Sequence, residues 1–364
     1  GARRGPSPDV RRRPAARRGR GLGVNGGHVQ VPLQDKVEAL ARPDAYPEPP
    51  RHIETIETHM SWVFLAGQRV YKLKKPVRMA RLDLRSLTAR RLNCAREVRL
   101  NRRLAGDVYL GVAALWKTPG GALSLAGPGR TVDWLVVMRR LPAERMLDAA
   151  IADDRVDPAD LFPFIDRMLR FYRDEAAPSG IGAVDYRENF NEGIALNRET
   201  LLDPAFDLPT PRLAAVLRMQ ERFVATRGDM LARRAAEGRV VEGHGDLRPE
   251  HVCLLDRPVA IDCLEFDRTL RLLDPLDELG YLALECDRLG APHLSAAILA
   301  RYREGAGDPC DPALVAFYQA FRACVRARLA VRHLEDPERE DGARWLRRAA
   351  DYLALAEARV VSLG

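Results

Sequence analysis

The chain has 364 residues, of which 46% are hydrophobic and 30% charged, a composition typical of globular proteins that bury a sizeable core. No apolar run approaches the roughly 18 residues that a membrane span requires, and no secretory signal follows the arginine-rich start. The six cysteines show no CxxC pair and no metal-finger spacing, which favours buried thiols in a reducing compartment. We therefore expect a cytoplasmic protein with no membrane partner.

The net charge of +7 comes from the N-terminus. Residues 1–30 hold eight Arg and one Asp, so residues 31–364 sum to zero. The few apolar residues of this segment cannot offset the cost of ordering it, about 1–2 kcal/mol per backbone residue. We expect residues 1–30 to form a disordered basic tail, with a functional basic arm or a transit peptide as alternatives. Nucleic acid is an unlikely partner, because only the tail offers the cations that phosphates need. Nothing in the sequence indicates the oligomeric state.

Lysine is rare in this chain and unevenly placed. Only five of the 58 basic residues are Lys, and three of these lie within four positions, at Lys72, Lys74 and Lys75. A lysine presents a compact point charge that the arginine fork does not reproduce. We therefore expect a lysine-specific role in this segment.

The first part of the chain predicts strands around one long helix. Two strands joined by a turn at Ala66-Gly67-Gln68 would place Val70, Lys72 and Lys74 on one face. Ser86 is a plausible N-cap for the helix. The expected elements are a short helix at 32–41, strands at 61–66 and 69–76, a helix at about 86–104, and strands at 108–118 and 131–141.

From about Leu147 onwards the pattern is helical, interrupted by two short strands within residues 240–280. The sequence therefore predicts an α+β fold of two lobes joined by a connector near Met138–Pro142. The small β-rich lobe would span residues 31–141, and the larger, mostly helical lobe residues 142–364.

Residues 240–280 are unusually acidic. Between His244 and Glu278 there are nine acids and four bases, a local net charge of 4 − 9 = −5. Several of these acids adjoin apolar runs that predict short buried strands. Carboxylates at such strand ends are costly unless a cation, either an arginine or a metal, lies beside them.

The same stretch contains a spacing typical of kinases. His244-Gly245-Asp246 follows a short apolar strand, His251 comes five residues after Asp246, and Asp262 follows the next strand pair. A catalytic Asp, a metal ligand five residues later and a second metal-binding Asp after a strand form the kinase pattern. Asp246 would accept or orient the proton of the acceptor hydroxyl, or else act as a cap. His244 is expected to brace the loop.

Four motifs together carry a family resemblance. They are Glu57–Leu65 (ETHMSWVFL), Val70–Pro76 (VYKLKKP), His244–His251 (HGDLRPEH) and Ile261–Phe266 (IDCLEF). With them the chain resembles the aminoglycoside phosphotransferase-like family of the protein-kinase-like superfamily, in an uncharacterised bacterial branch, over roughly residues 50 to 350. The resemblance implies a two-lobed protein-kinase-like fold. It also implies transfer of the γ-phosphate of ATP, with Mg²⁺, to a hydroxyl of a small-molecule acceptor.

The resemblance also implies roles for particular residues. Asp246 matches the catalytic Asp and Asp262 the principal Mg²⁺ ligand. Lys72 would bind the nucleotide phosphates, with Lys74 as second choice. Glu97 would orient that lysine, unless it is an ordinary solvated helix residue.

Other expected roles surround this core. Val136, Val137 and Met138 would contact adenine, or would be plain strand core. Asp274 and Asp277 match an element that braces the catalytic loop, with Arg322 or Arg326 as partner. Residues 147–235 would shape the acceptor pocket.

The chain departs from the family pattern at two points. His251 stands where the family usually has Asn, and imidazole suits Mn or Zn better than Mg²⁺. Either one metal site is altered or Glu265 supplies an oxygen instead. No GxGxxG is present, so the turn from Thr58 to Ser61 must bind phosphate through backbone N–H groups and the Ser61 hydroxyl. No Walker A motif occurs, which indicates the kinase-like part alone.

Two alternatives remain, the first of them motivated by these departures. One is a nucleotide-binding, pseudokinase-like module that regulates a partner without transferring phosphate. The other is a hydrolase with Zn²⁺ held by His244, Asp246 and His251.

Overall fold

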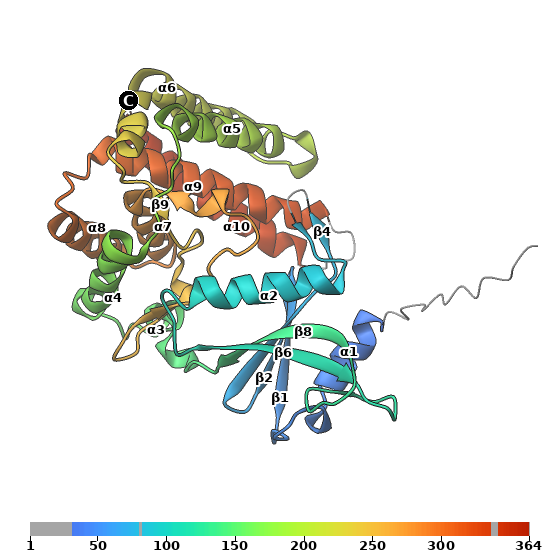
Figure 1. Ribbon diagram of the computed structural model, residues 1–364. Helices are drawn as coiled ribbons and strands as arrows, with labels where there is room; N and C mark the ends of the chain where they lie inside the picture. The colour runs from blue at the N-terminus through green and yellow to red at the C-terminus, as the bar shows by residue number, and fades with distance from the viewer. Residues whose placement is uncertain (1–30, 80–81, 336–340, 364) are drawn as a thin grey trace, which may run out of the picture.

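The computed structural model describes residues 31–79, 82–335 and 341–363. The expected basic tail, residues 1–30, lies outside these ranges. The described chain forms a β-rich lobe followed by a larger helical lobe (Figure 1). The predicted α+β fold of two lobes is confirmed. In the part of the chain that is described, no helix is long and apolar enough to cross a membrane.

The small lobe is built on a six-stranded sheet in the order β1-β2-β3-β8-β6-β7, with every neighbouring pair antiparallel. Gly67 closes the β2–β3 hairpin with φ +62°, a left-handed conformation that glycine adopts without a steric penalty. The strands of the sheet are β1 (Ile53–Glu57), β2 (Ser61–Ala66), β3 (Arg69–Lys74), β6 (Tyr109–Lys117), β7 (Leu123–Ser124) and β8 (Arg130–Arg139). A separate hairpin pairs β4 (Arg78–Met79) with β5 (Leu82–Asp83).

A helix covers each face of this sheet. Helix α1 (Leu33–Leu40) packs on one face, where Leu40 joins Phe64 and Leu73 in a buried cluster. Helix α2 (Leu87–Asn101) packs on the other face. The Ser86 side chain accepts a hydrogen bond from Ala89 N–H at 3.1 Å, as expected of an N-cap. Helix α2 ends at Asn101, before the predicted end at Leu104.

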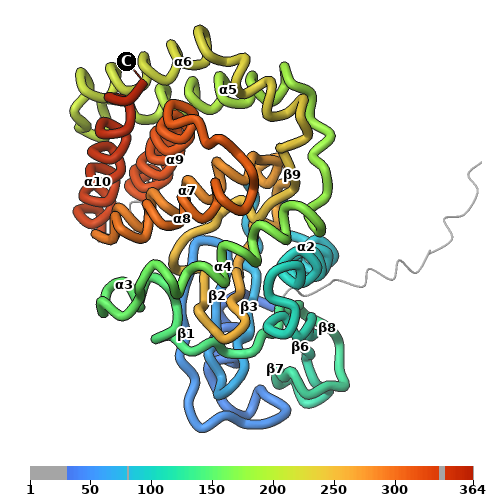
Figure 2. The backbone as a smooth tube through the Cα atoms, turned by 90° about the vertical axis from the view of Figure 1, so that its left-hand side faces the viewer, coloured from blue at the N-terminus to red at the C-terminus, as the bar shows by residue number. Residues whose placement is uncertain are grey.

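The large lobe is mostly helical. Its helices are α3 (Leu147–Ala152), α4 (Pro158–Arg170), a π-helical segment (Phe171–Glu175), α5 (Ala183–Leu201), α6 (Thr210–Ala236), α7 (Pro275–Arg288), α8 (Pro292–Ala306), α9 (Pro312–Arg332) and α10 (Gly342–Val360). Helices α5 and α6 form the end of this lobe farthest from the sheet, as Figures 1 and 2 both show. Helices α7, α9 and α10 lie nearer the small lobe.

The acidic stretch lies where the lobes meet. Strand β9 (Val241–Glu242) pairs with β12 (Leu272–Leu273), and β10 (Val252–Cys253) pairs with β11 (Val259–Ala260). Cys253 and Val259 are buried in the same cluster as residues of α2 and the sheet, so this hairpin belongs to both lobes. The β10–β11 hairpin lies between Asp246 and Asp262 in the chain, and thereby brings the two acids to one cleft.

Two buried ion pairs hold the helix that follows. Arg234 of α6 makes bonds of 2.5 and 2.7 Å to Asp274, and Arg322 of α9 makes bonds of 2.8 and 2.6 Å to Asp277. Arg322 was one of the two arginines expected near these acids. Arg234 was not foreseen, and Arg326 pairs with neither acid.

Candidate active site

A cleft of about 620 Å³ opens between the two lobes. Apolar side chains from the sheet form one wall, and charged side chains from β3 and the acidic stretch form the other. The apolar wall contains Val63, Leu65, Val70 and Met138. The charged wall contains Lys72, Lys74, Asp246, Arg248, Glu250, His251, Asp262 and Glu265.

An alternating chain of charges links the lobes across this cleft. Lys72 Nζ lies 2.5 Å from Asp262 Oδ1 and 3.0 Å from Glu97 Oε1. Lys74 pairs with the other oxygen of Glu97, and its Nζ lies 2.6 Å from Glu265 Oε1. The order is therefore Asp262–Lys72–Glu97–Lys74–Glu265, with Glu97 buried between the two lysines.

This arrangement separates the two candidate lysines. The Lys74 side chain is 1% exposed and that of Lys72 is 15% exposed. Burial alone would lower the pKa of Lys72, but the carboxylates of Asp262 and Glu97 raise it well above its usual value. Lys72 is thus the charged lysine open to the cleft, and Lys74 is an internal link between α2 and the acidic stretch. Lys75 lies elsewhere, paired with Glu57.

Asp262 is held in a conformation that few non-glycine residues adopt. Its φ is +60°, and its backbone N–H donates to the Tyr109 hydroxyl at 3.1 Å. The next residue, Cys263, donates its N–H to the Asn101 side chain at 2.9 Å. Strand β6 and helix α2 of the small lobe therefore fix the backbone on which Asp262 stands. Strained backbone of this kind is common at functional sites.

The loop that carries Asp246 is fixed by a buried carboxylate. Glu278 Oε1 accepts the N–H groups of His244 at 3.0 Å and of Gly245 at 2.6 Å. Gly245 has φ +92°, and a Cβ there would lie 3.0 Å from the Leu270 carbonyl oxygen, so no larger residue fits without strain. Helix α7 thus sets the path of the HGD tripeptide.

Both ring nitrogens of His244 are occupied by main-chain groups. Nε2 lies 2.8 Å from the Ile261 carbonyl oxygen, which can only accept, so Nε2 carries the hydrogen. Nδ1 then accepts the Asp246 N–H at 3.3 Å. Burial lowers the pKa of His244. His244 therefore braces the loop. Neither ring nitrogen is free to bind zinc, as the alternative of a zinc hydrolase requires.

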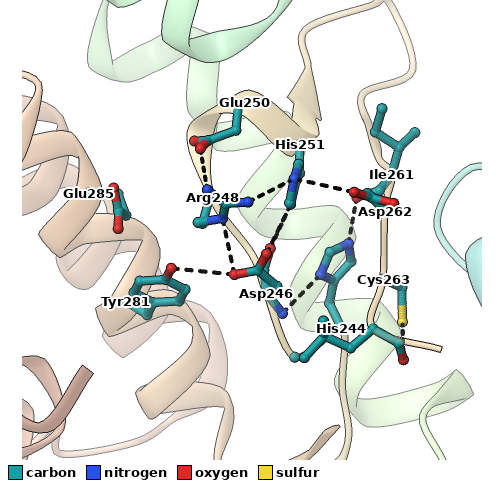
Figure 3. A network of polar contacts seen from close by, with 12 residues as sticks. His244, Asp246, Arg248, Glu250, His251, Ile261, Asp262, Cys263, Tyr281 and Glu285 are labelled. Atoms are coloured by element: carbon teal, nitrogen blue, oxygen red, sulfur yellow. Dashed lines mark hydrogen bonds and ion pairs between the residues drawn. The ribbon is translucent and has the colours of Figure 1, made fainter. Parts of the chain in front are cut away.

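The Asp246 carboxylate lies beside the Arg248 and Tyr281 side chains (Figure 3). Arg248 Nε lies 3.0 Å from Asp246 Oδ1, and the Tyr281 hydroxyl donates to the same oxygen at 3.3 Å. Burial alone would raise the pKa of Asp246, but Arg248 and, to a smaller extent, His251 and Arg326 lower it to about 2. Asp246 is therefore ionised at neutral pH, as an acceptor of a hydroxyl proton must be.

His251 lies between the two cleft acids. Its Nδ1 donates to the Asp246 carbonyl oxygen at 2.8 Å, and its Nε2 accepts from Arg248 Nη2 at 3.2 Å. The Nδ1 position carries a hydrogen, since a carbonyl can only accept. Nε2 lies 3.7 Å from Asp262 Oδ2.

The donor set suits a metal that arrives with phosphates. Among the described residues, no group of three or more His, Cys, Asp or Glu side chains is arranged to hold a metal ion. Mg²⁺ needs no such cage, because it commonly binds through one or two carboxylates plus substrate phosphates and water. Asp262 provides a carboxylate that is 43% exposed. Burial would raise the pKa of Asp262, but the charge of Lys72 holds this pKa well below the usual range of a carboxyl group. His251 Nε2 is the second candidate donor. Glu265 is committed to Lys74 instead, so it is poorly placed to replace the family's Asn.

The remaining predicted residues divide between cleft and core. Met138 lines the cleft, whereas Val136 and Val137 are not among the lining residues and pack within the small lobe. Ser61 also lines the cleft, and its buried hydroxyl has no hydrogen-bond partner in the described chain.

The turn before Ser61 has fewer free donors than expected. The Thr58 hydroxyl and N–H both donate to the Ser61 carbonyl oxygen, at 2.8 and 2.9 Å, and Thr58 Oγ1 accepts the Ser61 N–H at 3.0 Å. Within the described residues, the N–H groups of His59 and Met60 are left for a phosphate.

Sequence reasoning missed several residues that shape the site. Arg248 sits inside the HGDLRPEH motif, and its proximity to Asp246 could have been inferred from that spacing. Tyr109 and Glu278 reach the site from elements distant in sequence, and no local pattern marks them. No residue of 147–235 is among those lining the cleft, and the role of this region in acceptor binding stays a prediction.

The geometry decides the type of fold. Lys72 of strand β3 pairs with Glu97 of helix α2, which packs on the sheet. Asp246 follows strand β9, and Asp262 follows the β10–β11 hairpin. This is the arrangement of protein kinases. The chain has a protein-kinase-like fold.

Comparison of sequences finds relatives but no matching family model. Uncharacterised proteins of Mycobacterium tuberculosis (strain H37Rv) and of Mycobacterium bovis are each 33% identical over 336 residues, which is 88% of this chain. The chain spans 64% of the length of these relatives.

Solved structures of similar arrangement share little sequence. A choline/ethanolamine kinase family protein from Mesorhizobium loti is 16% identical with a TM-score of 0.47, over 90% of this chain and 99% of its own. An aminoglycoside phosphotransferase from Alicyclobacillus acidocaldarius is 15% identical with a TM-score of 0.46, over 93% and 97%. A choline kinase from Cryptosporidium parvum is 9% identical with a TM-score of 0.49, over 85% and 90%.

Proposed function

We propose that this protein is a phosphotransferase that moves the γ-phosphate of ATP to a hydroxyl of a small molecule. The observation that carries the proposal is the ion-pair chain from Asp262 through Lys72 to Glu97. It joins residues far apart in sequence and from both lobes, and it ends at a cleft that also contains an ionised Asp246. The resemblance of the motifs to aminoglycoside phosphotransferases supports the same reaction.

Each residue has a role in this proposal. Met138 and the apolar wall would contact the adenine ring. Lys72, oriented by Glu97, would bind the nucleotide phosphates, together with the free N–H groups of the turn before Ser61. Asp262 and His251 Nε2 would hold Mg²⁺, which when bound neutralises charge on the transferring phosphate. Asp246 would orient the acceptor hydroxyl and take its proton.

The test is Asp246→Asn, compared with Asp256→Asn as a matched control. Asp256 belongs to the same stretch, but its side chain is fully exposed. Its nearest partner, Arg145, is as far as 3.9 Å away. We expect Asp246→Asn to lower acceptor-dependent ATP consumption by about 10²–10⁴-fold, the usual contribution of a positioned base. Its MgATP affinity, measured by isothermal titration, should stay within about threefold of wild type, and the control should match wild type in both. Undiminished turnover in Asp246→Asn would remove the assignment.

One observation favours a second function, the nucleotide-binding module. Arg248 and Tyr281 both hold Asp246 Oδ1, so one oxygen of the presumed base is already engaged. MgATP binding without turnover, across a broad panel of hydroxyl compounds, would support the module over the enzyme.

A further inference from the structure

Three arginines of the helical lobe share one contact geometry. Arg234, Arg301 and Arg322 each make two parallel bonds to a single carboxylate, at distances between 2.5 and 2.8 Å. Bonds of this kind satisfy both the charge and the planar donor fork of a guanidinium.

Arg326 of α9 and Arg348 of α10 lack such a partner among the described residues. Arg326 lies 3.8 Å from Glu285 Oε1 and 3.4 Å from the Tyr352 hydroxyl. Glu285 is already engaged, because it accepts a bond of 2.7 Å from Tyr352 and another of 2.7 Å from Arg288. Arg326 is thus a neighbour of this carboxylate and not its partner.

Arg348 is held still more loosely. Its nearest carboxylate oxygen, Glu250 Oε1, is 3.9 Å away and belongs to the closer Arg248. Its Nε is buried without a hydrogen-bond partner. The side chains of Arg326 and Arg348 are only 17% and 23% exposed. Guanidinium groups withdrawn from water without a close acceptor are costly, which points to a ligand that supplies one.

Both arginines adjoin residues that surround the acid that would orient the acceptor. Arg326 lies 3.8 Å from Glu285, one helical turn of α7 after Tyr281, whose hydroxyl donates to Asp246. Arg348 lies 3.9 Å from Glu250, which lines the cleft and pairs with Arg248 beside Asp246. In Figure 3, Tyr281 and Glu285 lie on the side of Asp246 away from Asp262, the partner of Lys72.

An arginine-rich hollow continues from this side. A pocket of about 350 Å³ is lined by Arg288, Arg344, Arg347, Arg348 and a single acid, Asp351. Arg348 lines this pocket, and its neighbour Glu250 lines the cleft.

We infer that the acceptor is a hydroxyl compound with an anionic group, a carboxylate or a phosphate, which Arg326 and Arg348 bind while the hydroxyl faces Asp246. That the acceptor carries a hydroxyl rests on the proposed function. That it carries an anionic group rests on the arginines alone. A guanidinium fork matches either anion with two bonds. The same arginines repel cationic acceptors such as amino sugars with several ammonium groups.

The first arm of the test needs no turnover. Inorganic phosphate is titrated at constant ionic strength and followed by phosphorus NMR, with wild type, Arg326→Gln, Arg348→Gln and Lys72→Met. Arg218→Gln is the control, since Arg218 is an exposed residue of the distant helix α6. We expect each of the first two glutamine variants to weaken phosphate binding at least tenfold, with Lys72→Met and the control unchanged. Arg326→Lys, which keeps the charge but not the fork, should bind phosphate more tightly than Arg326→Gln and more weakly than wild type.

Absence of phosphate binding by wild type, wild-type affinity in both glutamine variants, or loss only in Lys72→Met would each overturn the anion site. The second arm compares phosphate transfer to glycerol, glycerate, glycerol phosphate and ethanolamine. An anionic member should have at least tenfold higher kcat/KM than the neutral and cationic ones, and Arg326→Gln should raise its KM at least tenfold. Preference for the neutral or cationic compound contradicts the inference. If no compound is phosphorylated but the first arm succeeds, the proposed function fails and the anion site stands.

Discussion

The acids of residues 240–280 form two groups that differ in exposure and in partners. Asp274 and Asp277 are buried in the helical lobe, and one arginine makes two short bonds to each. Asp246 and Asp262 lie at the cleft, with side chains 20% and 43% exposed. The closest partner of Asp262, Lys72, comes from the other lobe.

The pKa of Asp277 and the pKa values of the two cleft acids are shifted in opposite directions. Burial raises the pKa of Asp277, although Arg322 acts against it. For Asp246 and Asp262 burial acts in the same sense, but Arg248 and Lys72 respectively outweigh it and lower the pKa. Asp274 and Asp277, which have internal partners, hold α7 in place. Asp246 and Asp262 stay charged beside Arg248 and Lys72. The predictions below test this division between stability and function.

The largest effect on stability is expected from Asp274→Ala. The substitution removes the bidentate partner of Arg234, the N-cap contact to Leu276 N–H at 2.9 Å and the acceptor of the Tyr318 hydroxyl at 3.0 Å. Breaking a buried pair costs about 3–5 kcal/mol and losing a cap about 1 kcal/mol, so we expect a loss of at least about 4 kcal/mol in unfolding free energy. Urea denaturation measures this loss, and a change below about 1 kcal/mol would show that the pair is dispensable.

Lys74→Met and Lys72→Met should affect different properties. Loss of Lys74 leaves Glu265 unpaired in a buried place, and we expect a loss of about 3 kcal/mol in stability. Loss of Lys72 leaves Glu97 with Lys74 and leaves Asp262 solvated, so stability should change by no more than about 1 kcal/mol. MgATP affinity should instead fall at least tenfold in Lys72→Met. Denaturation measures the stability of both variants, and isothermal titration measures their MgATP affinity. A loss of stability in Lys72→Met together with a loss of affinity in Lys74→Met would reverse the roles of the two lysines.

The pH dependence of stability should reveal the charge on Asp246. Its pKa is lowered from 3.8 to about 2, so ionised Asp246 contributes stability above pH 4 that is lost as the pH falls through about 2. At 1.36 kcal/mol per pKa unit, this contribution is about 2 kcal/mol. Unfolding free energies of wild type and Asp246→Asn, measured between pH 6 and pH 2, should converge by about that amount at the acid end. A difference independent of pH would contradict the lowered pKa.

Tyr281→Phe should have the smallest effect. The Tyr281 hydroxyl donates to Asp246 at 3.3 Å, a long bond that shares its acceptor with Arg248. Such a bond contributes about 0.5–1.5 kcal/mol, so we expect a change in kcat of roughly two- to tenfold and a nearly unchanged melting temperature. A complete loss of turnover would mean that Tyr281, and not Arg248, positions Asp246.

Local patterns in the sequence predicted the elements and several of their ends. Alternation in β3 predicted that Lys72 and Lys74 share a face, and both do contact Glu97. Ser86 was identified as the cap of α2 because a cap needs only its own neighbours. The motif spacing likewise predicted that Asp246 and Asp262 belong to one site, and both line the cleft.

Contacts between distant elements could not be predicted in the same way. Arg234 is separated from Asp274 by four short strands and their loops, and the choice among many arginines depends on how α6 and α7 pack. Tyr109 meets Asp262 across the lobe boundary, so no period in either segment marks the pair. The acceptor side was assigned to residues 147–235 because they are helical, but helicity alone does not say which helices adjoin Asp246.

The most direct test of the central claim is the effect of Mg²⁺ and ATP on the melting temperature of wild type and Asp262→Asn. Asp262 is partly exposed and lies at the end of the ion-pair chain, so its replacement should leave the melting temperature without ligand within a few degrees. MgATP should raise the wild-type melting temperature more than ATP with EDTA does, and Asp262→Asn should lose that Mg²⁺-dependent increment. An undiminished increment in the variant, or no increment in wild type, would contradict a nucleotide–metal site in this cleft.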